Sequence, residues 1–424
     1  MIPPLVRHTL RSLIGGRCCQ HRVFSSESSG QLLTIQEVRE NLSQMVGVRK
    51  QWLSEVVPPV VMQKVAESQA ELPKRKPSDS FVKAVIPLSQ PEAREKYITY
   101  TKKIRFGRLL EDFDSLGGLI CYNHNKNPSL SEDQKSPYAF VTALVDRIEK
   151  SPSKPSLSPY KDIILYGQVT WVGRSSMECT MHCEQEFNGE WQKVLTARYL
   201  FVARNPIQNT AGVVNPLDPQ TEEEIELFKL GEENKKIRQR EGMQSLLKTP
   251  PTEEERLTIH DLFLSTVDLN SGTFKVRVKP ENSVWMDETI KKSLIICHPE
   301  QRNLYNKIFG GFLMRKAYEL AWANTSFHAK TRPNICKIVD NIVFRRPVEI
   351  GSLLFLSSQI VYTKGPDVQV HVHAEVVDPE KGTREATNDF HFTFDTGIPN
   401  VPTVMPKTYA ESMLYLVGKR SYNS

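Results

Sequence analysis

Long apolar runs are missing from this chain of 424 residues. None approaches the roughly 18 consecutive apolar residues that a membrane-spanning helix needs, so the sequence predicts no membrane span. A strong charge of one sign is also missing, since 55 Lys and Arg against 49 Asp and Glu leave a formal net charge of +6. A charge this small and this dispersed does not predict nucleic-acid binding.

Paired cysteines and a serine-nucleophile motif are missing too. Five of the seven cysteines lie beyond residue 30 and form no C-x-x-C pair, which favours free buried thiols over a disulfide framework or a zinc site. No G-x-S-x-G motif occurs, because GRSSM (173–177) lacks the final glycine, so a serine hydrolase is disfavoured. His371 and His373 alternate along one strand face, which is typical of packing or surface histidines.

The first thirty residues differ from the rest of the chain. They contain four arginines, several serines and no acid before Glu27. Arginines interrupt the apolar stretches, so the segment lacks the apolar core of a secretory signal, and its composition is typical of a mitochondrial transit peptide. A basic arm is the alternative. Without these residues the net charge falls by four positive charges and one negative charge, from +6 to about +3.

The rest of the chain contains two copies of one structural unit. In each copy an apolar strand with an internal aspartate precedes two alternating strands joined by a polar turn, and a final strand follows. The matching segments are 141–149 with 336–344, 162–184 with 353–375, and 197–204 with 388–396. Ahead of these strands, 105–121 parallels 308–324, and both have apolar residues at helical spacing. The sequence therefore predicts an α+β fold with one long helix packed on one antiparallel sheet in each unit.

These patterns predict the organisation of the whole chain. A charged, helix-forming connector joins the two units, and a Pro-rich extension precedes the first. The predicted segments are a transit peptide (1–30), a helical N-terminal extension (31–80), a first domain (81–205), a charged helical linker (206–258), a second domain (259–399) and a C-terminal tail (400–424).

The two predicted helices have complementary polar residues. Aligning them places Asp114 of the first copy against Tyr318 of the second. The second copy has Asn303 and a complete FGG (309–311), where the first copy has only RFGR. Each copy lacks what the other has, so we expect Asp114 and Asn303 to meet across a pseudo-twofold interface and form one complete site.

The residue types suit acyl transfer. Backbone N–H groups of Gly310 and Gly311, at the start of a helix, are expected to form an oxyanion hole. Asn303 would add an amide donor or orient a water, and Asp114 would accept a proton from that water or attack directly. The alternatives are close helix–sheet packing for the glycines, a cap or turn role for Asn303, and a solvated aspartate.

The same residues resemble a known family. NLYNKIFGGFLM (303–314) resembles the N-x-x-G-x-x-[FH]-G-G segment of hotdog-fold acyl-CoA thioesterases, with Asn306 where the family often has glycine. IRFGRLLEDFDSLGG (104–118) resembles the matching helix of the first unit in the mitochondrial acyl-coenzyme A thioesterase 9 group of double-hotdog enzymes. The similarity spans roughly residues 80 to 400.

This resemblance implies a tandem (double) hotdog fold and hydrolysis of acyl-CoA thioesters to fatty acid and coenzyme A, without a metal or bound cofactor. It assigns the catalytic roles to Asn303 and Asp114, from opposite units. Several related enzymes place the asparagine in the first unit and the acid in the second. Here that polarity is reversed, so we expect the other interface to be active, with Glu319 as a weaker candidate acid.

Coenzyme A carries several phosphates, so basic side chains are expected at the mouth of the site. The candidates are Arg345, Arg346, Arg174 and Ser175, with plain surface charge as their alternative. Two other functions stay open: a hydratase or dehydratase, for which His298 is the close candidate base, and a non-catalytic acyl-CoA-binding paralogue. We further expect a mitochondrial, and more specifically matrix, location and a homo-oligomer.

Overall fold

The computed structural model describes residues 32–46, 66–127, 136–151, 153–205, 210–271, 273–302, 307–332 and 335–423. The predicted transit peptide and Asn303 lie outside these residues. Among the described helices, none is long and apolar enough to cross a membrane.

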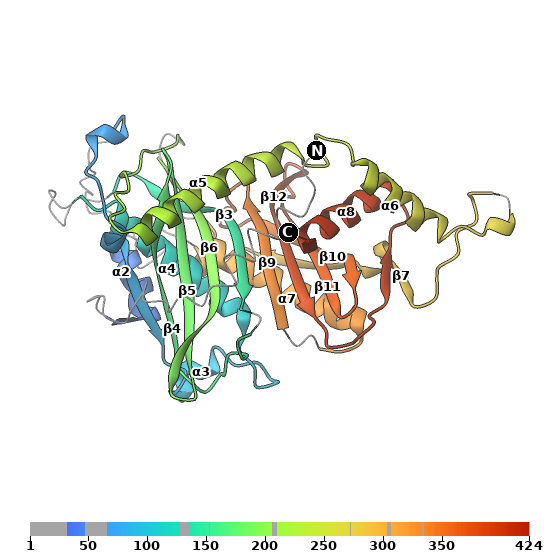
Figure 1. Cartoon of the computed structure of the whole chain (residues 1–424), viewed down its shortest axis with the longest axis horizontal. Helices are drawn as coiled ribbons and strands as arrows, with labels where there is room; N and C mark the ends of the chain where they lie inside the picture. Colours follow the sequence, from blue (N-terminus) through green and yellow to red (C-terminus); the bar gives the residue numbers. More distant parts are fainter. Residues whose placement is uncertain are drawn as a thin grey trace. The chain divides into compact units, whose positions relative to one another are not determined.

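Within the described residues, one sheet of 11 strands has the order β1-β2-β4-β5-β6-β3-β9-β12-β11-β10-β8 (Figure 1). Read outward from its centre, the sheet repeats one order, β3-β6-β5-β4-β2 on one side and β9-β12-β11-β10-β8 on the other. Neighbours are antiparallel except the outer pair β1–β2. The strands are β1 Leu32–Thr34, β2 Val82–Ile86, β3 Ala139–Lys150, β4 Ile163–Val172, β5 Ser176–Phe187, β6 Glu190–Arg204, β8 Lys291–Ile296, β9 Ile335–Phe344, β10 Leu353–Lys364, β11 Asp367–Asp378 and β12 Thr383–Asp395.

One long helix accompanies each half of the sheet. Helix α4 contacts β3 to β6, and α7 contacts β8 and β10 to β12. The helices are α2 Ile35–Val46, α3 Pro91–Glu95, α4 Phe106–His124, α5 Glu222–Met243, α6 Glu253–Leu264, α7 Gly310–Ala329 and α8 Tyr409–Asn423. A separate two-stranded sheet pairs β7 Ser283–Trp285 with β13 Thr403–Met405. This duplicated arrangement confirms the predicted tandem hotdog.

The period-two pattern of the strands separates two faces of the sheet. In β12, Phe390, Phe392 and Phe394 are fully buried on the side of α7, while the residues between them face the other way. Gly117 lets α4 approach the sheet closely in the first half, because a Cβ there would lie 2.6 Å from the Phe201 ring of β6. The result is a helix enclosed by its own sheet in each unit.

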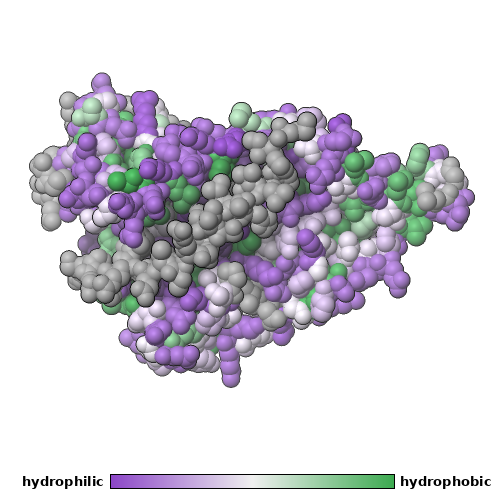
Figure 2. Space-filling view, viewed as in Figure 1, coloured by the Kyte–Doolittle hydropathy of each residue, from purple (hydrophilic) through white to green (hydrophobic). Residues whose placement is uncertain are grey.

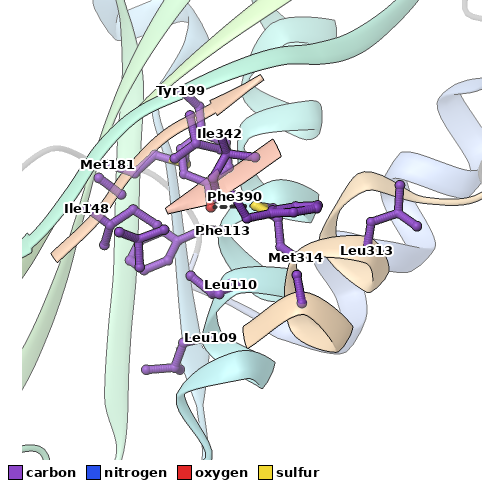
Figure 3. Close-up of a cluster of buried hydrophobic side chains, with 14 of the residues drawn as sticks. Leu109, Leu110, Phe113, Ile148, Met181, Tyr199, Leu313, Met314, Ile342 and Phe390 are labelled. Carbon is purple, nitrogen blue, oxygen red and sulfur yellow. Dashed lines mark hydrogen bonds between the residues drawn. The ribbon is translucent and has the colours of Figure 1, made fainter. Parts of the chain in front are cut away.

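The two units share one core where they meet. Strands β3 and β9 pair in antiparallel register from Leu144↔Val343 to Glu149↔Ile338, and α4 packs against α7. Figure 3 shows side chains from both helices and both half-sheets in one cluster, in which Tyr199 OH lies 3.9 Å from Met314 Sδ. The described chain therefore buries its apolar surface across the unit boundary and not only within each unit.

The flanking segments pack on the sheet and on α4. Figure 1 shows α5 and α8 on the face of the sheet that is turned away from α4 and α7. The predicted connector is a helix that begins with a capping box at Thr221. It is not solvated all round, because Gly231 lies against Trp171 and Arg238 bonds Glu178 at 2.9 Å. In the N-terminal extension, α2 is tied to α4 by Arg39 and Asp112 at 2.6 Å.

Candidate active site

The site lies where the N-terminus of α7 crosses α4. A Cβ at residue 311 would lie 2.8 Å from Glu111 Cα and 3.2 Å from Asp114 Cβ. Real Cβ atoms do not approach a backbone carbon that closely, so only glycine at position 311 allows α4 to lie here. A Cβ at Gly310 would lie 3.2 Å from Asp114 Oδ2. The Gly-Gly pair therefore brings the predicted acid against the helix start.

Asp114 is held by one hydrogen bond to each oxygen. Its Oδ2 accepts from Gly311 N–H at 2.7 Å, and its Oδ1 accepts from the Thr142 hydroxyl at 2.5 Å. The side chain is buried, and burial raises its pKa to about 6, because a carboxylate loses its hydration there. The bonds from Thr142 and Gly311 lower this pKa, and the charge of Glu111 raises it. A buried carboxyl with a pKa near neutrality suits general-base chemistry.

The other acids of α4 have basic partners. Glu111 bonds both Arg108 and Arg315, and Asp112 bonds Arg39. Among the described residues, Asp114 has no ion-pair partner. Salt bridges therefore account for Glu111 and Asp112, while Asp114 is left with neutral donors only.

The glycine N–H groups are used differently from each other. Gly311 N–H donates to Asp114, so it is not free for a substrate. Gly310 is the first residue of α7, so its N–H has no acceptor within the helix. It also has no acceptor elsewhere in the described part of the chain. Of the two predicted oxyanion donors, Gly310 is the available one.

Asp114 and Gly310 open onto a cavity of about 1270 Å³ between the two units. Its walls combine apolar residues of α4, α7 and β3 with a group of basic side chains. The basic residues are Arg39, Arg108, Arg204, Arg302, Lys307, Arg315, Arg345 and Arg346. Of the two buried carboxyls in the described lining, Glu111 is paired with arginines and Asp114 is not. An unpaired carboxyl beside a largely basic wall suits a long apolar substrate with anionic groups at one end.

At the pseudo-symmetric position, the described residues hold Tyr318 in place of an acid. Gly107 faces Arg315 and Tyr318 as Gly311 faces Glu111 and Asp114, so both pairs are related by 204 residues (311 − 107 and 318 − 114). Matching the two F-G pairs alone would give 203 and place Ala317 opposite Asp114. The packing establishes Tyr318 as the equivalent of Asp114.

Tyr318 fills its position with aromatic packing. Its ring centroid lies 5.4 Å from that of Phe106 and 5.7 Å from that of Phe392. Glu319, the alternative acid, bonds Arg105 at 2.5 Å and is one-third exposed. Among the described buried carboxyls at these two helix crossings, Asp114 is the one without a basic partner, since Glu111 pairs with Arg108 and Arg315.

The predicted phosphate-binding residues separate into two groups. Arg345 and Arg346 line the cavity; Arg345 pairs with the largely buried Asp389, and Arg346 pairs with the exposed Glu385. Arg174 and Ser175 occupy the turn between β4 and β5, where their carbonyl groups accept backbone hydrogen bonds. They are not among the described residues that line the cavity. Asn303 lies outside the described residues, so its predicted role stays a prediction.

Two contacts of the site were not predicted from the sequence. Thr142 lies on β3, 28 residues after Asp114, and a single threonine in an apolar strand gives no spacing signal. The bond from Arg315 Nε to Glu111 Oε1, at 2.7 Å, joins the two helices at pseudo-equivalent positions. The sequence could have indicated this contact, because aligning the two helices places the basic Arg315 opposite the acidic Glu111.

Comparison with curated proteins identifies relatives along most of the chain. The chain is 49% identical over 395 residues, which are 92% of this chain and 88% of the relative, to mitochondrial acyl-coenzyme A thioesterase 9 of Homo sapiens. It is 46% identical to mitochondrial acyl-coenzyme A thioesterase 10 of Mus musculus, over 92% of this chain and 89% of the relative. A mitochondrial acyl-coenzyme A thioesterase 4 of Humulus lupulus is 36% identical over 78% of this chain and 62% of the relative.

Other comparisons add less. No family model matches the chain. Among solved structures, an acyl-CoA hydrolase of Staphylococcus aureus in complex with butyryl coenzyme A, coenzyme A and coenzyme A disulfide aligns with 33% of this chain and 88% of its own. Its identity of 20% and TM-score of 0.32 are too low to support an inference. The identity to curated relatives extends along most of this chain and confirms the resemblance inferred from the sequence. The chain belongs to the mitochondrial acyl-coenzyme A thioesterase 9 family.

Proposed function

We propose that this chain hydrolyses acyl-CoA thioesters in the cavity between α4 and α7, with Asp114 as general base and Gly310 N–H as oxyanion donor. The chain is a thioester hydrolase by family. The observation that carries the residue assignment is the buried Asp114 carboxyl, with a pKa of about 6. It lies against the start of α7, whose first N–H has no acceptor in the part of the chain that the structure describes.

Asp114 would activate the attacking water. With Oδ2 bound to Gly311 and Oδ1 to Thr142, the carboxylate is fixed in orientation and keeps a lone pair on each oxygen. The water gives its proton to the carboxylate as it attacks the thioester carbonyl carbon, which forms a tetrahedral intermediate. Collapse of the intermediate breaks the carbon–sulfur bond, and the proton passes from Asp114 to the departing thiolate.

Gly310 would stabilise the oxygen of that intermediate. Its N–H has no acceptor among the described residues and stands at the N-terminus of α7, where the helix dipole favours negative charge. Preorganised donors of this kind typically contribute about 10²–10³ in rate. Asn303, seven residues earlier in the chain, is proposed as the second donor or as the residue that orients the water.

The basic wall would bind the phosphates of coenzyme A. Arg345 and Arg346 are the proposed ligands, since both line the cavity and their side chains are 45% and 57% exposed. Arg346 can turn toward a phosphate because its ion pair with Glu385 is exposed. Arg345 would have to leave Asp389, whose side chain is only 16% exposed. Arg174 and Ser175 stay as predicted ligands, with no support from the cavity.

A hydratase is the less favoured alternative. His298 would have to supply its acid–base group, but this residue is exposed at the start of a short 3₁₀ helix, Pro299–Gln301. It is not among the described cavity residues. Asp114 instead lies at the helix start, where a water and a carbonyl group can be brought together.

The proposal also covers the location of the protein, the mitochondrial matrix, and its assembly, a homo-oligomer. Curated relatives are named mitochondrial, and the chain is a mitochondrial member; we place it in the matrix because of the predicted transit peptide. Homo-oligomerisation is supported by exposed apolar residues on the edge strand β8, where Leu294 and Ile296 are 54% and 53% exposed. Figure 2 shows a further apolar group beyond α6, where Phe274 is 73% exposed.

The test is thiol release from acyl-CoAs of different chain lengths by the wild type and by Asn303→Ala. We expect release by the wild type and a loss of about 10²–10³ in kcat for the variant. An enoyl-CoA hydration assay run in parallel separates the hydratase. If no acyl-CoA releases thiol at any chain length, the protein is an acyl-CoA-binding paralogue and the proposal is wrong.

A further inference from the structure

Three potential metal ligands converge outside the cavity, on the face of the sheet away from α7. His371 and His373 belong to β11, and Asp389 belongs to β12, where it pairs directly with His373. They lie on the same face as Gln369, which bonds Ser421 of α8 at 3.0 Å. The alternation of the strands that buries the β12 phenylalanines under α7 thus gathers these polar residues on the outer face.

The two imidazoles point at one carboxylate oxygen. His371 Nε2 lies 3.0 Å from Asp389 Oδ1, and His373 Nδ1 lies 2.7 Å from the same atom. One ligand atom from each of the three residues lies within 4.8 Å of the other two. Around a tetrahedral zinc ion, with bonds of about 2.0–2.1 Å, ligand atoms are about 3.3 Å apart. To match, the two distances from a histidine nitrogen to Asp389 Oδ1, 3.0 and 2.7 Å, would lengthen by about 0.3 and 0.6 Å.

We propose that His371, His373 and Asp389 bind a divalent transition-metal ion, with Zn²⁺ as the best fit. Two imidazoles and one carboxylate are a donor set that zinc accepts, with water in the fourth position. Each histidine now points a ring nitrogen at Asp389. On metal binding that nitrogen presents its lone pair to the ion, and the ring proton moves through solvent to the other nitrogen.

Neighbouring groups are placed to hold these ligands. His373 Nε2 lies 3.5 Å from Glu375 Oε1, so Glu375 can accept the ring proton of a metal-bound His373. The His391 ring stacks on His371 with centroids 4.9 Å apart, and its Nδ1 is buried without a partner among the described residues. A carboxylate behind one ligand and a buried ring against the other are typical supports of a metal site.

Arg345 is the group that opposes a cation here. It pairs with Asp389 Oδ2 and leaves Oδ1, where both histidines converge, as the ligand atom. The Arg345 side chain is 45% exposed, so solvent screens its repulsion of the ion. If Asp389 served only to pair with Arg345, there would be no need for two histidines directed at its other oxygen, Oδ1.

Metal titration of the untagged full-length chain tests the proposal. After removal of metal with a chelator, Zn²⁺ and Co²⁺ are added, and binding is followed by calorimetry and by the visible absorption of four-coordinate Co²⁺. We expect the wild type to bind one more ion than His373→Ala, with its unfolding midpoint raised by zinc. Glu375→Gln should keep the site and bind about 10–100-fold more weakly.

Two controls keep the result specific. His260→Ala removes an exposed histidine of α6 and should bind as the wild type does. Asp389→Asn keeps the shape of the side chain, so its loss of the same ion would exclude misfolding as the cause. Equal stoichiometry and affinity for wild type, His373→Ala and Asp389→Asn, or no binding by the wild type, would overturn the proposal.

Discussion

Replacing Asp114 with asparagine should lower the rate of catalysis by at least about 10²-fold and stabilise the protein at neutral pH. The folded chain raises the pKa of this carboxyl from 3.8 to about 6 through burial, so the folded state binds the proton more tightly than the unfolded state. Stability from this group is therefore complete below pH 4 and is lost as the pH rises toward 6. At about 1.36 kcal/mol for each pH unit, the ionised carboxyl costs about 3 kcal/mol at pH 7.

Asparagine removes that cost and keeps an oxygen for Gly311 N–H. Urea unfolding of the wild type and Asp114→Asn at pH 7 should show the variant to be more stable, by at most about 3 kcal/mol. At pH 4 the difference should nearly vanish, because the wild-type carboxyl is then neutral. Equal stability at pH 7, or the same gain at both pH values, would refute the view that burial of charge sets this pKa.

Three further predictions concern the same site. The kcat/KM should rise about tenfold between pH 5 and pH 7 with a midpoint near 6, and Thr142→Val should move that midpoint upward because a bond that lowers the pKa is lost. Gly311→Ala should destabilise the fold by about 1–3 kcal/mol and lower activity, since its Cβ would meet the α4 backbone. Arg346→Ala should raise KM for acyl-CoA and leave kcat nearly unchanged.

Matched variants separate these effects from general damage. Thr142→Ser keeps the hydroxyl and should keep the midpoint; a shift equal to that of valine would contradict the hydrogen-bond account. Gly242→Ala, where nothing lies within 4 Å of the added carbon, should be nearly neutral in urea unfolding. Arg174→Ala should leave KM unchanged, and a larger effect than that of Arg346→Ala would move the phosphate site away from the cavity.

The repeat was predictable because its segments recur in the same order, and the placing of Asp114 beside the FGG helix was predictable because each copy lacks what the other has. Asp114 without an acid at Tyr318, and FGG without a second copy of it, indicated one site between the units. The register was less secure, since the F-G pairs suggest 203 residues where the helix packing gives 204. The F-G pair does not occupy the same place in the two helices: α4 begins at the phenylalanine of its pair, Phe106, and α7 begins at the glycine of its pair, Gly310.

The finer geometry depends on contacts that sequence spacing does not encode. The Gly311 N–H binds Asp114 only because α4 and α7 approach within van der Waals contact at that glycine. Thr142 reaches the same carboxylate from a strand paired with the other unit. Arg174 was predicted near the cavity and is not among the described residues that line it. Its position is set by the ends of β4 and β5, and the sequence does not show where those ends lie relative to the cavity.

The most direct test of a single site between the two units compares thiol release by Asp114→Asn and Glu319→Gln at saturating acyl-CoA. Loss of a general base typically costs about 10²–10⁴ in rate, so we expect Asp114→Asn to lose at least 10²-fold by that estimate and Glu319→Gln to stay close to the wild type. Activity that survives Asp114→Asn and disappears in Glu319→Gln would place the chemistry at the other interface and contradict the account.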